Sequence, residues 1–129
     1  MTTFEDAAGS YPYQVPIDAY GNGGFRFADM SHKGALLCLP SGIRAWGVKA
    51  PADALTKDDF AAIFNEAEFI DVVLFGTGGV HALPSAQLRA AFQDAGIGLE
   101  AMTTGSAART YNILLGERRK VAAALLVVA

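Results

Sequence analysis

The second half of the chain alternates helix-like and strand-like segments, and this alternation limits the fold more than any other feature. Thr56 to Asp59 is typical of a helix start, because a capping threonine precedes an acidic first turn. Beyond it, apolar residues recur at helical spacing or in short compact runs. The expected order is helix, strand, helix, strand, helix and strand, at residues 57–67, 69–75, 85–95, 97–102, 104–115 and 121–128. The third helix opens at Thr104, Gly105 or Ser106 and ends before Gly116.

The first half is typical of β structure. Short apolar runs at residues 25–27, 35–39 and 43–48 are separated by Gly, Pro and Ser, which predicts an antiparallel meander. Residues 11–24 contain two prolines and three glycines and predict an extended arm with a turn at 21–23. We expect a flexible N-terminal arm over residues 1–14 and one domain over residues 15–129.

The two halves together predict an α/β fold. Strands that alternate with helices form a three-layer unit with a mixed, mostly parallel sheet and helices on both faces. The N-terminal antiparallel meander extends or covers that sheet. The chain has 129 residues and is 52% hydrophobic, which suits one domain with one core.

Charge and hydropathy exclude several classes of protein. A net charge of −3 argues against nucleic-acid binding, which needs clustered cations. The longest apolar run covers residues 121–129, whereas a membrane-spanning helix needs about 20 residues. Cys38 is the only cysteine, and the N-terminus has no secretory or transit signal, so a cytoplasmic location is expected.

A glycine-rich turn is the first candidate site. Gly76, Thr77, Gly78 and Gly79 follow the strand at 69–75, at the end where open α/β sheets bind ligands. Their amides suit an anion, yet the dinucleotide fingerprint and the P-loop ending are both absent. A tight structural turn and a weak anion site both remain open.

The start of the third helix is the second candidate, and it is expected at the same edge of the sheet. Thr103 and Thr104 suit the helix cap, and Arg109 lies early in the helix, against the dipole preference for acids. Asn112 lies on the same side as Arg109. Two interpretations remain open. Arg109 and Asn112 either bind an anion, or Arg109 forms a surface salt bridge and Asn112 a hydrogen bond to the backbone of a loop. The cations at 118–120 complement the helix dipole or border a docking surface.

Catalytic and metal-binding patterns are weak. His32 and His81 are the only histidines, and neither has metal-ligand spacing to a cysteine or carboxylate. His81, beside the glycine-rich turn, is either an acid–base group or a simple solvated side chain. We expect neither a metal nor a cofactor.

The motifs resemble a known family. Residues 17–27 (IDAYGNGGFRF), Trp46, the turn at 76–78 and the run at 102–125 are similar to a small α/β family of unassigned function. That family includes the mitochondrial complex I (NADH:ubiquinone oxidoreductase) assembly factor 3 and adipogenesis-associated relatives. The resemblance implies a single compact domain with a mixed sheet and no recognised cofactor or metal. The lack of a targeting presequence suits a bacterial, cytoplasmic member.

Two functions follow as hypotheses. The preferred one is a non-catalytic, assembly-factor-like binding protein with a protein partner. The alternative is a domain that binds an anionic small molecule, or an unassigned enzyme. Both use the edge formed by Gly76–Gly79 and Thr103–Asn112.

Overall fold

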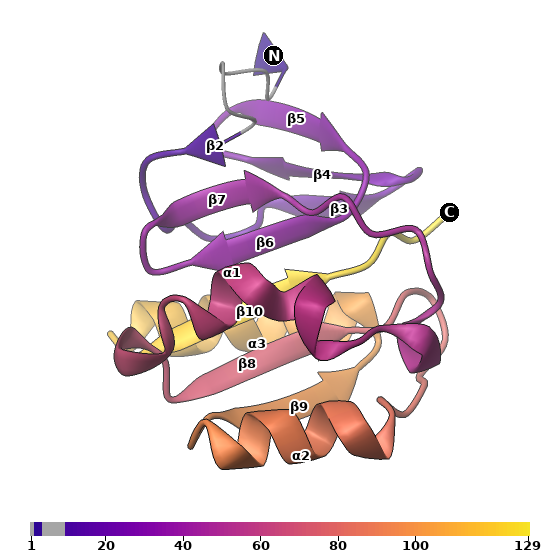
Figure 1. Cartoon of the computed structure of the whole chain (residues 1–129). Coiled ribbons are helices and arrows are strands. Elements are labelled where there is room, and N and C mark those ends of the chain that lie inside the picture. Colours follow the sequence, from indigo (N-terminus) through magenta and orange to yellow (C-terminus); the bar gives the residue numbers. More distant parts are fainter. Residues whose placement is uncertain (1, 4–9) are drawn as a thin grey trace.

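The computed structural model describes residues 2–3 and 10–129, which form two sheets and several short helices (Figure 1). The larger sheet has six strands in the order β2-β7-β6-β10-β8-β9. Its strands are β2 (Ser10–Tyr11), β6 (Leu36–Leu39), β7 (Gly42–Ala45), β8 (Val72–Gly76), β9 (Gly98–Met102) and β10 (Val121–Leu125). The smaller sheet has the order β1-β5-β4-β3 and comprises β1 (Thr2–Thr3), β3 (Ala19–Gly21), β4 (Gly24–Phe27) and β5 (Met30–Lys33).

The larger sheet is mixed, as the sequence predicts. β10, β8 and β9 run parallel to one another, whereas β6 pairs antiparallel with β10 and β7 pairs antiparallel with both β6 and β2. The parallel share is therefore smaller than expected, because the β6–β7 hairpin of the first half joins this sheet as antiparallel strands. The antiparallel strands expected in the first half are present, but they divide between the two sheets. The run at 25–27 lies in β4, which pairs antiparallel with β3 and β5 in the smaller sheet, whereas the runs at 35–39 and 43–48 contribute β6 and β7 to the larger sheet.

The helices differ from the sequence prediction mainly between β7 and β8. This segment contains η1 (Ala52–Ala54), η2 (Lys57–Phe60), α1 (Ala61–Phe64) and η3 (Ala67–Phe69), in place of one helix over 57–67, although the predicted start after Thr56 is confirmed. Tertiary bonds hold these short turns: the Trp46 indole donates to the Asp59 carbonyl, and the Glu66 carboxylate accepts from Ser41. The expected strand start at Phe69 is wrong, because Phe69 ends η3 and is exposed.

The remaining helices agree with the sequence. They are α2 (Ala86–Asp94), whose cap Ser85 accepts from the Leu88 amide, and α3 (Thr104–Gly116), capped by Thr103. Figure 1 shows α3 behind the larger sheet, with α1 and α2 in front of it. No helix in the described part of the chain is long and apolar enough to cross a membrane.

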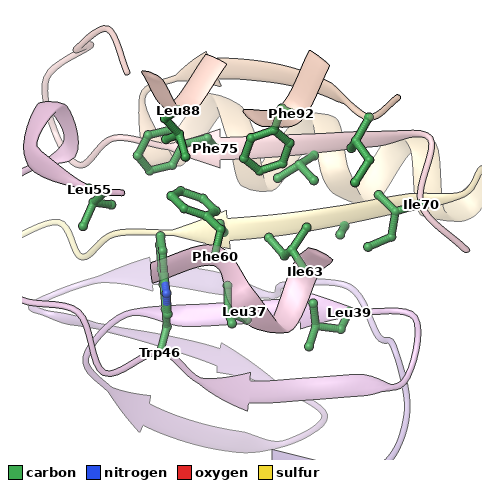
Figure 2. Close-up of a cluster of buried hydrophobic side chains, with 14 of the residues drawn as sticks. Leu37, Leu39, Trp46, Leu55, Phe60, Ile63, Ile70, Phe75, Leu88 and Phe92 are labelled. Atoms are coloured by element: carbon green, nitrogen blue, oxygen red, sulfur yellow. The ribbon is translucent and has the colours of Figure 1, made fainter. Parts of the chain in front are cut away.

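Each face of the larger sheet has its own core. Alternate residues of β10 point to opposite faces of the sheet. Ala122 and Ala124 belong to the core between the sheet and η2, α1 and α2. Ala123 and Leu125 belong to the core between the sheet and α3. The first core is rich in aromatic side chains, including Trp46, Phe60, Phe75 and Phe92 (Figure 2). The second contains Phe25 and Phe27 of the smaller sheet. The three-layer α/β fold is thus confirmed.

The N-terminal segment contacts both sheets. Residues 1 and 4–9 of the expected flexible arm lie outside the described residues. Within the arm, β1 pairs with β5 and β2 pairs with β7, and the side chain of Gln14 donates to the Val121 carbonyl at 2.7 Å. Residues 19–27 form a β3–β4 hairpin around the expected turn.

Candidate functional site

The glycine-rich turn and the start of α3 lie at one edge of the larger sheet. β8, β9 and β10 are parallel, so Gly76, Met102 and Leu125 bring their carboxyl ends to the same side, which is the right-hand side of Figure 1. Open α/β sheets bind ligands at this edge. The structure thus places the two predicted regions next to each other.

Gly76 and Thr104 lie in direct contact at this edge. A methyl group added at Gly76 would lie 2.8 Å from the Thr104 hydroxyl oxygen and 2.9 Å from its Cα. Thr104 is fully buried, and its hydroxyl donates to the Leu126 carbonyl at 2.7 Å. Gly76 is therefore required for the close approach of α3 to the sheet.

The amides of the glycine-rich turn bond within the protein. The Thr77 amide donates to the Met102 carbonyl at 2.8 Å, and the Gly78 amide donates to the Thr104 hydroxyl at 2.9 Å. The Thr77 hydroxyl donates to the Val80 carbonyl and accepts from the Ala82 amide. These bonds fix the turn and leave the Thr77 and Gly78 amides committed, so an anion cradle built from them has little support.

The start of α3 is covered by the protein's own side chains. Thr103 accepts from the Ser106 amide, and the Tyr20 ring lies so close to Gly105 that a methyl group there would clash with it. Asn112 bonds twice to Ile17: its Oδ1 accepts from the Ile17 amide and its Nδ2 donates to the Ile17 carbonyl, both at 2.8 Å. These contacts attach the segment before β3 to α3.

Arg109 and His81 are both exposed. Within the described part of the chain, Arg109 forms no ion pair with a carboxylate, unlike the surface salt bridge considered from the sequence. His81 lies in the loop after β8, between Val80 and Ala82, whose backbone groups both bond the Thr77 hydroxyl. Neither side chain belongs to the hollow described next.

A hollow of about 940 Å³ opens beside the glycine-rich turn. Its walls come from three regions: the segment after β7, the turn after β8, and the segment after β10. They are joined by the end of β5 and the residues that follow it. The lining residues are His32–Ala35, Ala45–Asp53, Thr77–Val80, Ala82, Leu126 and Val127.

The hollow combines apolar side chains with cations. Trp46 is buried in its wall and packs against Phe60, with ring centroids 5.1 Å apart. Val80 is 78% exposed, the highest value among the large apolar side chains that the structure describes. Lys33 and Lys49 line the hollow with one acid, Asp53. Burial lowers the pKa of His32, whose Nε2 bonds the Ala35 carbonyl, so this side chain favours the neutral form.

Of the residues that the sequence suggests for a site, Thr77, Gly78 and Gly79 line the hollow, and its other lining residues are not among them. Lys33, Trp46 and Lys49 belong to the β-rich half, and no local spacing connects them to the turn after β8. Trp46 stands out in the sequence only as the single tryptophan and as part of the family resemblance.

Other chemistry has little support in this structure. The described residues contain no group of three or more His, Cys, Asp or Glu side chains able to hold a metal ion. Cys38 is fully buried beside Tyr111, and burial raises the pKa of its thiol to about 12, so the reactive thiolate is disfavoured.

Comparison with known proteins identifies the family. The family model described as "Protein of unknown function (DUF498/DUF598)" matches residues 17–126. The chain belongs to this family. The match covers both regions on which the resemblance rests, residues 17–27 and the run at 102–125, and so confirms it.

Several known proteins and solved structures are similar to this chain over most of its length. An uncharacterized protein of Rhodobacter capsulatus is 39% identical over 87% of this chain and 84% of that protein. The mouse NADH dehydrogenase (ubiquinone) 1 alpha subcomplex assembly factor 3 is 30% identical over 90% of this chain, which spans 62% of that relative's length. A crystal structure described as an outer membrane protein from Bartonella henselae is 44% identical, with a TM-score of 0.86, over 92% of this chain and 99% of that one.

Proposed function

We propose that this chain is a non-catalytic binding protein that acts like an assembly factor, with a subunit of a bacterial NADH dehydrogenase as its protein partner. The hollow beside the glycine-rich turn is the contact surface, and the cytoplasm is the location. The observation that carries the proposal is the exposed Val80 at the rim of a largely apolar hollow. Large apolar side chains at such a rim favour contact with a protein.

The similarity to the mouse assembly factor supports a protein partner. The alternative, an anionic small molecule held by Arg109 and the turn amides, has less support. The Thr77 and Gly78 amides already donate within the protein. A thermal-shift series with carboxylates and phosphates, run on the parent and on Arg109→Ala, tests this alternative directly.

The test of the main proposal compares two substitutions in one loop. Val80→Asp places a charge at the rim of the hollow, and Leu83→Asp makes the same change at a side chain that is 64% exposed and lies outside the lining. Tagged proteins are expressed in a bacterial strain that lacks the chromosomal copy. We expect the parent and Leu83→Asp to co-purify with NADH dehydrogenase subunits and to restore the assembled enzyme on native gels. Val80→Asp should do neither, and equal recovery with all three proteins would refute the proposal.

A further inference from the structure

The cationic side of the hollow continues onto the smaller sheet. A second hollow of about 710 Å³ lies on β3, β4 and β5, and it shares His32 and Lys33 with the first. Its lining adds Arg26 and, among the residues that the structure describes, includes no carboxylate. Lys33 therefore stands where the two hollows meet, between Lys49 in one and Arg26 in the other.

The lysines at the first hollow form no ion pairs within the described part of the protein. Neither Lys33 nor Lys49 forms an ion pair with a described carboxylate, although the chain carries 13 acidic residues against 10 basic ones. Among the residues with described positions, Asp53 is the only acid in the lining of the first hollow. Two lysines at one hollow, neither paired with a carboxylate of residues 2–3 or 10–129, offer a complementary surface for negative charge.

The lining of the first hollow also contains apolar residues, some of them in the same segments as the lysines. They include Ala35, Trp46, Val80, Leu126 and Val127. A lining that combines apolar side chains with lysines suits a ligand that has both apolar and acidic groups. The two adjoining hollows are together larger than a small acid fills, since single drug-sized ligands occupy roughly 300–1,000 Å³.

We propose that the two adjoining hollows bind an extended acidic segment of a partner protein, with its apolar side chains beside Trp46 and Val80 and its carboxylates beside Lys33 and Lys49. This inference rests on the proposed function and specifies the chemistry of the partner. The apolar contacts supply most of the affinity, and the lysines select for acidic over neutral or basic segments. A nucleic acid does not suit the site, because its apolar walls cannot contact a phosphate backbone and the protein has a net charge of −3.

The single tryptophan makes the test direct, because Trp46 lines the hollow and its fluorescence reports on occupancy. The probes are short synthetic peptides that share the same Leu, Val and Phe residues and carry Glu, Gln or Lys at the remaining positions. We expect the Glu peptide to change the Trp46 emission and to bind most tightly, with an affinity that falls as salt rises. Lys33→Gln and Lys49→Gln should each weaken it by about two- to fivefold.

Lys120→Gln is the matched control. It removes the same charge from an exposed lysine next to the start of β10, the end of that strand opposite to the hollow, and should leave binding unchanged. The inference would be overturned if the Glu and Gln peptides bound equally well. It would also be overturned if Lys33→Gln and Lys49→Gln bound the Glu peptide as tightly as the parent does. Competition by free succinate at the affinity of the Glu peptide would also overturn it and indicate a small-molecule site.

The inference and the proposed function fail in different ways. If Val80→Asp loses the dehydrogenase subunits in cells while the Glu peptide shows no preference, the partner is real and its acidic chemistry is wrong. If the Glu peptide binds with the expected lysine dependence while the dehydrogenase assembles normally without this protein, the acidic segment is real and the proposed partner is wrong.

Discussion

Thr104 and Gly78 are joined by two hydrogen bonds of opposite direction. The Thr104 amide donates to the Gly78 carbonyl, and the Gly78 amide donates to the Thr104 hydroxyl, each at 2.9 Å. The same hydroxyl donates to the Leu126 carbonyl. One buried side chain therefore connects the turn after β8, the start of α3 and the segment after β10.

Thr104→Val should destabilise the protein by about 1–3 kcal/mol, because it leaves the Gly78 amide and the Leu126 carbonyl without this partner in a buried site. Urea unfolding measures the change. Thr110→Val is the control: that hydroxyl contacts only the Met102 sulfur, at 3.8 Å, so its loss should cost much less. Equal losses for both variants would contradict the role assigned to Thr104.

Gly76→Ala should also be destabilising, by about 1–3 kcal/mol, since the added methyl group forces α3 away from the sheet. Gly116→Ala, at the end of α3, meets no atom within 4 Å and should be neutral or stabilise by up to about 1 kcal/mol. Thermal unfolding of the two variants separates these effects. A Gly76→Ala protein as stable as the parent would show that the helix contact is looser than the structure indicates.

Asn112 and Arg109 should behave differently although they lie one turn apart. Asn112→Ala removes both bonds to Ile17 and should cost about 1–3 kcal/mol of stability. Arg109→Ala changes an exposed side chain and should stay within about 0.5 kcal/mol of the parent. Denaturant midpoints of the two variants check this, and a large loss for Arg109→Ala would reveal a structural role that the contacts do not show.

The turn between β4 and β5 can be improved. Ala28 and Asp29 both have positive φ, 47° and 61°, whereas the neighbouring hairpin places the favoured pair Asn22 and Gly23 in the same kind of turn. Replacing Ala28 by Asn and Asp29 by Gly should raise stability by about 0.5–1 kcal/mol. The reverse exchange, Ala and Asp at 22 and 23, should lower it. Thermal unfolding midpoints of the two double variants measure these changes. A midpoint that rises, or falls, in both variants would contradict this account.

His32 should make stability depend on pH. Burial lowers its pKa below 6.5 in the folded protein, so the unfolded chain binds more protons between that lowered pKa and 6.5. The contribution of His32 is therefore complete above pH 6.5 and is lost as the pH falls through the folded-state pKa. Urea unfolding at several pH values should show a shallower slope for His32→Gln than for the parent. If the stability of His32→Gln changed with pH as steeply as that of the parent, the dependence would be assigned to the carboxylates.

Much of the fold follows from local patterns, whereas the hollow does not. The alternation after Thr56 predicts the order of helices and strands, and the parallel strands place Thr77 and Thr104 at one edge. Phe69 shows the limit of this reasoning, because an apolar run does not reveal which of its residues face solvent. Lys33 and Lys49 reach the site only through the antiparallel pairing of β6 with β10. Such long-range pairing leaves no periodic signal in either segment.

The position of β10 has a consequence for how the protein is made. β10 is the last strand of the larger sheet to be synthesised, yet it lies between β6 and β8 and contributes to both cores. Until β10 has been synthesised, β6 and β8 both lack their shared neighbour, and each has an unpaired edge in its place. The larger sheet therefore closes only after β10 has emerged, and unpaired strand edges of this kind make incomplete chains prone to aggregation.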